Sequence, residues 1–109
     1  MYYFKPTENG ECFSYTAYDK EREAGFCKCR LKDDTLILES AEFLSEEIFE
    51  GLVRSSLNYG ANRGAYIAIA SPGYCDNVLK RLGFSQNDRG EYSGEIPELL
   101  SSCSECLRK

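Results

Sequence analysis

The sequence contains no histidine among its 109 residues. This absence excludes serine–histidine and cysteine–histidine nucleophile pairs, and any zinc site with a histidine ligand. Proton transfer in this chain would therefore have to use glutamate, aspartate, tyrosine, cysteine, lysine or water.

Long apolar runs and a basic surface stripe are also missing. No apolar run approaches the roughly 20 residues that span a bilayer, and the first residues, MYYFKP, show no basic region followed by an apolar one. We therefore expect a cytoplasmic protein that does not interact with membranes. The net charge of −5 repels phosphate backbones, so nucleic acid is not expected as a partner.

The length suits one domain with a single core. A hydrophobic fraction of 42% is ordinary for a globular protein, and the chain has neither an internal repeat nor a linker-like segment. We predict a single domain over residues 1–109, with a cysteine-containing tail from about residue 98.

The first half of the chain predicts an antiparallel meander. Residues 11–18 alternate in the period of a strand and are rich in β-favouring side chains. Two further strands are predicted at residues 23–31 and 35–43. The turns between them are short and polar, so consecutive strands must run antiparallel.

A helix is predicted from Ser45 to Gly60. Ser45 is a favourable N-cap, and Glu46 and Glu47 stand where the helix dipole favours negative charge. Gly60 or Gly64 ends the helix. The almost continuously apolar run at residues 65–70 predicts a central strand covered on both faces, parallel to strand 35–43 after a right-handed crossover.

The last part of the chain predicts one more helix and strand. Residues 76–82 place apolar side chains on one helix face, and Gly83 supplies the C′ position with Phe84 packing behind it. A polar loop at 85–90 and a strand at 91–96 follow. The predicted fold class is α/β (α+β), with a mixed central sheet: an antiparallel meander, then helix, parallel strand, helix and strand.

This order resembles the GNAT-type N-acetyltransferase fold. The resemblance rests on Gly25-Phe26, on the strand–helix–strand order that follows, and on the closing Leu82-Gly83-Phe84. It implies acetyl-CoA or another acyl-CoA as cofactor and an amine of a small molecule or protein as acceptor. It also implies that backbone N–H groups near Phe43 and Leu44 hold the acyl carbonyl oxygen.

The resemblance further places Ser45 at the cofactor's pyrophosphate, with Lys80 beside an anionic ligand. The family binds the pyrophosphate with a glycine-rich turn before the central helix. Here residues 41–47 contain no glycine, only Gly51 corresponds, and Glu46, Glu47 and Glu50 lie in the neighbourhood. Carboxylates within about 4–6 Å of a pyrophosphate repel it, so the cofactor turn is degenerate relative to the family.

Two other features depart from the family pattern. The position of the family's general-acid tyrosine falls on Leu79, which leaves Tyr74 as the candidate catalytic acid. Residues 1–10 are too short for the two helices that wall the acceptor site in the family, and residues 1–5 form either a remnant first strand or an edge. Any acceptor pocket is therefore open or completed by a second subunit, which makes a homodimer an expected assembly.

The six cysteines allow three interpretations. Cys103 and Cys106 have the C-x-x-C spacing of half a thiolate zinc site, for which Cys27 and Cys29 or carboxylates would be the other ligands. Cys27 and Cys29 share a strand face about 6.5–7 Å apart, which is wide for one ion unless the strand bulges. Alternatively, Cys12, Cys27, Cys29 and Cys75 are small core residues, or some cysteines form disulfides.

Three functions remain open from the residues and the resemblance. The first is acyl-CoA-dependent N-acyl transfer. The second is a catalytically inactive GNAT-like module that acts by binding or dimerisation. The third is a zinc- or thiol-dependent protein centred on Cys103 and Cys106.

Overall fold

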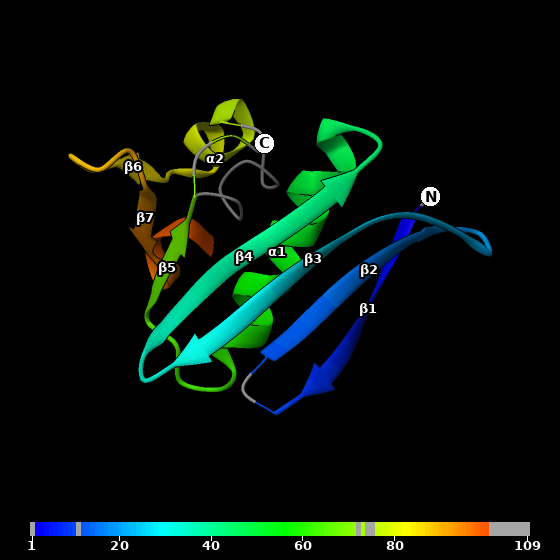
Figure 1. Ribbon diagram of the computed structural model, residues 1–109, viewed down its shortest axis with the longest axis horizontal. Coiled ribbons are helices and arrows are strands. Elements are labelled where there is room, and N and C mark those ends of the chain that lie inside the picture. The colour runs from blue at the N-terminus through cyan, green and yellow to red at the C-terminus, as the bar shows by residue number, and fades with distance from the viewer. Residues whose placement is uncertain (1, 11, 72, 74–75, 101–109) are drawn as a thin grey trace.

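The computed structural model describes residues 2–10, 12–71, 73 and 76–100, and its strands form one mixed sheet (Figure 1). The elements are β1 (Tyr2–Asn9), β2 (Cys12–Asp19), β3 (Arg22–Lys32), β4 (Thr35–Phe43), α1 (Glu46–Ala61), β5 (Ile67–Ala70), α2 (Asp76–Leu82), β6 (Ser85–Gln86) and β7 (Tyr92–Glu95). Residues 96–100 are helical as well.

The sheet has the strand order β1-β2-β3-β4-β5-β7-β6. Strands β1 to β4 pair antiparallel with their sequence neighbours because only short turns join them. Strand β5 pairs parallel with β4, since α1 carries the chain back along the sheet. The predicted mixed sheet, an antiparallel meander followed by helix, parallel strand, helix and strand, is confirmed.

Helix α1 begins and ends with recognisable caps. The Ser45 Oγ accepts a hydrogen bond from the Ile48 N–H at 3.4 Å, as predicted for the N-cap. At the other end Gly64 has a φ of +93°, and the Ala65 N–H donates to the Gly60 carbonyl at 2.9 Å. These are features of a Schellman motif, so Gly64 rather than Gly60 terminates the helix.

Helix α2 ends in the same way. Gly83 has a φ of +113°, its N–H donates to the Lys80 carbonyl at 3.1 Å, and the Phe84 N–H donates to the Leu79 carbonyl at 3.0 Å. Phe84 is buried behind the turn. The predicted role of Leu-Gly-Phe as a helix stop is confirmed.

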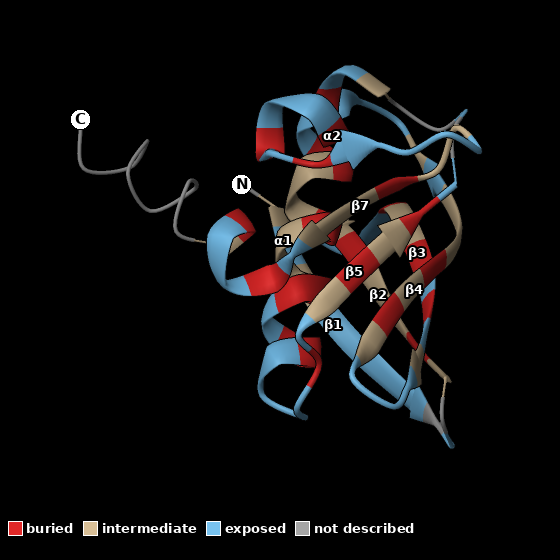
Figure 2. Cartoon of the chain, turned by 90° about the vertical axis from the view of Figure 1, so that its left-hand side faces the viewer, coloured by how far each residue is buried: buried red, intermediate tan, exposed pale blue. Residues whose placement is uncertain are grey.

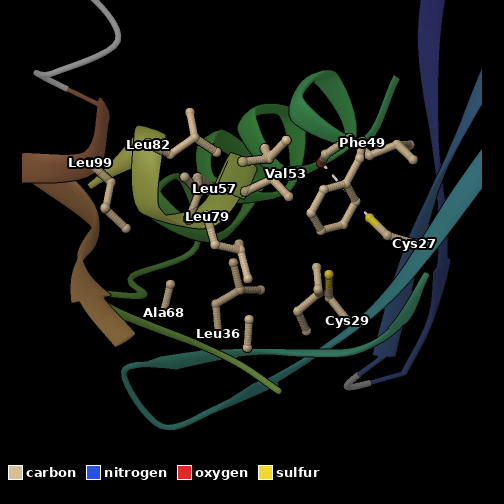
Figure 3. Packing of buried hydrophobic residues seen from close by; sticks show 14 of the residues in the cluster. Cys27, Cys29, Leu36, Phe49, Val53, Leu57, Ala68, Leu79, Leu82 and Leu99 are labelled. Carbon is tan, nitrogen blue, oxygen red and sulfur yellow. Dashed lines mark hydrogen bonds between the residues drawn. The ribbon is translucent and has the colours of Figure 1, made fainter. Parts of the chain in front are cut away.

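The core lies between the sheet and the helices. In Figure 1, β3 and β4 lie in front of α1, and the rings of Phe43 and Phe49 stack at 4.5 Å between β4 and α1. Figure 3 shows Leu79 of α2 and Leu57 of α1 pointing toward Leu36 on the sheet. Figure 2 shows that buried segments concentrate where the helices meet the strands.

The residues that the structure describes cover strand β5 on only one face, whereas the sequence predicts cover on both. Ala68 and Ala70 are buried, and both line a small internal gap with residues of α1 and α2. Ile67 and Ile69 point to the opposite face, where they are only half-buried. The apolar run was a correct indicator of a central strand, but it could not indicate that both helices pack on the same side.

The two ends of the described chain are more regular than predicted. The N-terminal segment forms a complete eight-residue edge strand, β1, which pairs along its whole length with β2. The predicted loop at 85–90 begins with the short strand β6. Within the predicted tail, residues 98–100 are helical and Leu99 is buried. None of the described helices is long and apolar enough to cross a membrane.

Candidate functional site

The site is built around the end of β4, which extends beyond its parallel neighbour. β4 pairs with β5 only from Thr35 to Leu38, opposite Ile67 to Ala70. The β3–β4 register then shifts, because Cys29 pairs with Leu38 and Lys28 with Ser40, leaving Glu39 as the extra residue of a bulge. Residues 39–43 therefore continue past the end of β5, and residues 40–43 pair only with β3.

The backbone at this end of β4 has one donor in use and one directed away from β3. The Leu44 N–H donates to the Ala24 carbonyl at 3.1 Å. Since successive N–H groups of a strand point to opposite sides, the Phe43 N–H points toward the side that β5 occupies lower in the sheet. Of the two predicted carbonyl-binding residues, the structure thus leaves Phe43 as the backbone donor. The Leu44 side chain is 80% exposed beside it.

A cavity of about 570 Å³ opens at the same place. It is lined by residues 23–26 of β3, residues 41–44 of β4 and its end, and Gly73. Glu23 and Glu42 give it negative charge, and none of the described residues that line it is cationic. Gly25 allows the strands to meet there, because a Cβ at this position would lie 2.7 Å from the Glu42 carbonyl oxygen.

The loop after β5 is anchored at the mouth of this cavity. The Gly73 N–H donates to the Asp76 Oδ1 at 3.1 Å. The buried Tyr92 of β7 also hydrogen-bonds to Asp76, and burial first, then this bond, raises the pKa of Tyr92. Asp76 therefore connects Gly73 to the core. Tyr74, the predicted catalytic acid, lies outside the described residues.

The first turn of α1 faces the same end of the molecule. Ser45, predicted as a cofactor-binding residue, is exposed and already uses its Oγ as the N-cap. Its carbonyl accepts from the Phe49 N–H at 3.1 Å. The Glu46 and Glu47 N–H groups belong to the four that a helix start leaves without intrahelical partners. Both side chains are exposed acids in this turn.

Arginines offset the third acid of this region. Glu50 forms ion pairs with Arg54 at 2.6 Å and with Arg81 of α2 at 2.7 Å. Two guanidinium groups thus contact one carboxylate, so the summed charge of the Glu50, Arg54 and Arg81 side chains is positive. Lys80, the remaining predicted cofactor-binding residue, is exposed on α2 next to Arg81.

Gly51 has a packing role. It lies inside α1, where a Cβ would collide with the Phe4 ring of β1. The residue that corresponded to a phosphate-binding glycine is therefore the place where β1 packs against the central helix.

The described cysteines are free thiols. Cys27 and Cys29 are completely buried on the face of β3 that packs against α1, as the core interpretation predicted. The Cys27 Sγ lies 3.1 Å from the Ser56 Oγ. The hydrogen bond with Cys27, together with burial, raises the pKa of Cys29, so this thiol stays protonated.

Within residues 2–10, 12–71, 73 and 76–100, no cluster of three or more potential metal ligands occurs. Cys103 and Cys106, the predicted metal ligands, and Cys75 lie outside these residues. The zinc hypothesis therefore stays a prediction about the C-terminal segment.

Sequence reasoning did not identify Glu23 and Glu42 as cavity residues. Both lie near bulges. Glu23 directly precedes Ala24, the extra residue where the β2–β3 register shifts, and Glu42 follows three residues after Glu39, the extra residue of β4. A bulge changes which face the following side chains occupy, and the residue alternation alone gives no sign of it.

Solved structures of acetyltransferases share this architecture. The chain is similar to an aminoglycoside 6'-acetyltransferase of type Ii, with a TM-score of 0.68 and 17% identity, covering 81% of this chain and 71% of that one. It is similar to nourseothricin acetyltransferase, with a TM-score of 0.65 and 17% identity, covering 86% and 84%. It is also similar to the PaiA N-acetyltransferase of Thermoplasma acidophilum in complex with coenzyme A, with a TM-score of 0.64 and 13% identity, covering 78% and 60%.

These likenesses show that the chain has the GNAT-type N-acetyltransferase fold. No protein-family model matches the sequence, and no curated protein matches it.

Proposed function

We propose that this chain binds an acyl-CoA and transfers the acyl group to an amine. The observation that carries the proposal is the end of β4. There, β4 extends beyond the end of its parallel neighbour β5 and borders a cavity of about 570 Å³. The chain has the fold of acetyltransferases.

The proposed chemistry is direct transfer. The amine nitrogen attacks the thioester carbonyl, its carbonyl oxygen becomes negative, and the Phe43 N–H stabilises that charge as a hydrogen-bond donor. The C–N bond forms, the C–S bond breaks, and the CoA thiolate leaves and takes up a proton. The amine gives its proton to water or to a carboxylate of the cavity.

The cavity supports an amine as the acceptor. Glu23 and Glu42 attract an ammonium group, and Phe26 and Phe43 offer apolar surface to the carbon chain that carries it. A small-molecule amine and the terminal amine of a protein both have this chemistry. The two acids favour acceptors that carry positive charge over neutral ones.

The pyrophosphate of the cofactor is assigned to the start of α1. Free N–H groups and the positive end of the helix dipole attract an anion there. Arg81 and Lys80 of α2 add positive charge, and the pairing of Glu50 removes part of the repulsion that the sequence predicts. Glu46 and Glu47 oppose binding, so we expect modest affinity.

Isothermal titration calorimetry with acetyl-CoA and with free CoA tests this proposal. We expect binding tighter than about 100 μM, which corresponds to about −5.5 kcal/mol. Lys80→Glu should weaken it, while Arg89→Glu, an equal charge change in the exposed loop before β7, should not. Absence of binding at millimolar ligand would refute the proposal.

The second candidate function is an inactive GNAT-like module that acts by binding or dimerisation. One observation favours it. β1 ends at Asn9 and β2 begins at Cys12, so no helix lies between these two strands to form the side of an acceptor site. Mass spectrometry of amines incubated with the protein and acetyl-CoA separates the candidates. Binding of CoA with no acylated amine across a panel of mono- and polyamines would favour the inactive module.

A further inference from the structure

One cross-strand row of the sheet marks the point where β4 separates from β5. The row runs from Leu38 of β4 through Ala70 of β5 to Tyr92 of β7, and all three residues are buried. Leu38 is the last residue of β4 that pairs with β5, and β4 continues beyond it along β3 (Figure 1). Tyr92 therefore belongs to the row at which the two parallel strands part.

The hydroxyl of Tyr92 connects this row to the loop after β5. Tyr92 is 1% exposed, and its hydroxyl donates a hydrogen bond to the Asp76 carboxylate. A buried tyrosine hydroxyl requires such a partner. The Oδ1 of the same carboxylate accepts the Gly73 N–H at 3.1 Å. Asp76 thus bonds both to a buried side chain of the sheet and to the backbone of the loop, and we call this chain of bonds the Tyr92 relay.

The relay ends at the cavity. Phe43 and Gly73 both line it. Phe43 belongs to the end of β4, which β3 holds through the Gly25–Phe43 pair. Gly73 is exposed, and its bond to Asp76 fixes it relative to the sheet. The separation of the two lining residues therefore depends on β3 on one side and on Asp76 on the other.

We propose that Tyr92 is a positioning residue for acyl transfer, which acts through Asp76 on the Gly73 side of the cavity. This inference rests on the proposed function, in which the acyl carbonyl binds at the Phe43 N–H and the amine attacks it inside the cavity. Tyr92 touches neither reactant. It fixes one wall of the space in which they meet.

The relay should act on the transfer step and not on cofactor binding. Attack requires the reacting atoms to lie about 3–3.5 Å apart, and a misplacement of about 1 Å can cost roughly a hundredfold in rate. The cofactor's pyrophosphate is assigned to the start of α1, which takes no part in the relay. Loss of the Tyr92 hydroxyl should therefore lower kcat and leave the affinity for CoA unchanged.

The relay can be broken without removing a buried ring. Tyr92→Phe keeps the ring beside Ala70 and deletes only the bond to Asp76. Asp76 is half-buried, so water can solvate its carboxylate after the change. Asp76→Ala removes both bonds of the relay. Asp76→Asn keeps an Oδ1 acceptor for Gly73 and an amide that can pair with the Tyr92 hydroxyl.

Exchange of the Gly73 amide proton with water, measured by NMR on the protein without ligand, tests the relay itself. The exchange should be several-fold faster in Tyr92→Phe and in Asp76→Ala than in the wild type, and close to the wild-type rate in Asp76→Asn. Tyr59→Phe is the matched control, because this buried tyrosine bonds to the Glu8 carboxylate near the far end of α1. It should leave Gly73 unchanged. Equal exchange of Gly73 in Tyr92→Phe and the wild type would overturn the proposal.

Release of the CoA thiol from acetyl-CoA, measured with the panel of mono- and polyamines, tests the effect on transfer. Tyr92→Phe should lower kcat by roughly tenfold or more, with the calorimetric dissociation constant of CoA unchanged. Asp76→Asn should retain most of the wild-type kcat, and Tyr59→Phe all of it. An unchanged kcat in Tyr92→Phe, or a parallel loss of kcat and CoA affinity, would overturn the positioning role. A wild type that transfers nothing would instead refute the proposed function and the role in transfer with it, while the exchange of Gly73 still decides whether the relay exists.

Discussion

Single residues decide how β4 ends beside the cavity. Leu44 donates its N–H to Ala24, so Phe43 is left to point its own N–H away from β3. Gly25 keeps the two strands in contact there, since any side chain would strike the Glu42 carbonyl. The site therefore depends on backbone positions more than on side-chain chemistry.

Gly51 provides a residue-scale test of how β1 packs. Gly51→Ala should destabilise the protein by about 1–3 kcal/mol, because the new Cβ enters the space of the Phe4 ring. In a Phe4→Ala background the same change should instead stabilise by about 0.5–1 kcal/mol, since alanine is the better helix former. Urea unfolding of the four proteins measures both values. Stabilisation by Gly51→Ala in both backgrounds would show that Phe4 does not pack there.

We expect Tyr92 to make the protein less stable to unfolding at alkaline pH. Burial, followed by the hydrogen bond to Asp76, raises the pKa of Tyr92 in the folded state. The unfolded chain then releases this proton first, so the contribution is complete below the ordinary tyrosine pKa of about 10 and is lost as the pH rises through the folded-state value. Melting temperatures measured from neutral to strongly alkaline pH should fall less steeply for Tyr92→Phe than for the wild type. Parallel curves would contradict the assignment.

At the scale of elements, the proposed function gives the start of α1 a second use beside its helix cap, and the two uses compete. Ser45, Glu46 and Glu47 stabilise the helix, but the two carboxylates repel a phosphate at the same N–H groups. The ion pairs of Glu50 with Arg54 and Arg81 compensate part of this repulsion and connect α1 to α2.

The double variant Glu46→Gln/Glu47→Gln separates these uses. It should bind CoA more tightly, with the gain largest at low salt, because charge repulsion is screened by ions. It should also lower the free energy of unfolding by about 0.3–1 kcal/mol per site. Calorimetry and urea unfolding measure the two effects, and Glu21→Gln in the exposed β2–β3 turn is the control. Unchanged CoA affinity at low salt would place the anion elsewhere.

Most elements could be predicted because their signals are local. Ser45 before two acids predicts a helix start, and Gly83 before Phe84 predicts a helix stop, through hydrogen bonds within a few residues. The bulges at Ala24 and Glu39 could not be predicted, since they depend on how three strands fit over α1. The cavity acids Glu23 and Glu42 were missed for that reason.

At the scale of the whole molecule, one helical layer covers one face of a twisted mixed sheet (Figure 1). The fold is shared with acetyltransferases of solved structure. Among the residues that the structure describes, no helix covers the opposite face of the sheet. The proposed cofactor site lies at one end of this scaffold, where β4 extends past β5.

The most direct test of the central claim is a titration of the uniformly ¹⁵N-labelled protein with CoA, followed by amide chemical shifts. The predicted site requires saturable shifts at Phe43, Glu46 and Glu47, with smaller changes in the β6–β7 region on the far edge of the sheet. No shifts at millimolar CoA, or shifts confined to β6 and β7, would contradict an acyl-CoA site at the end of β4.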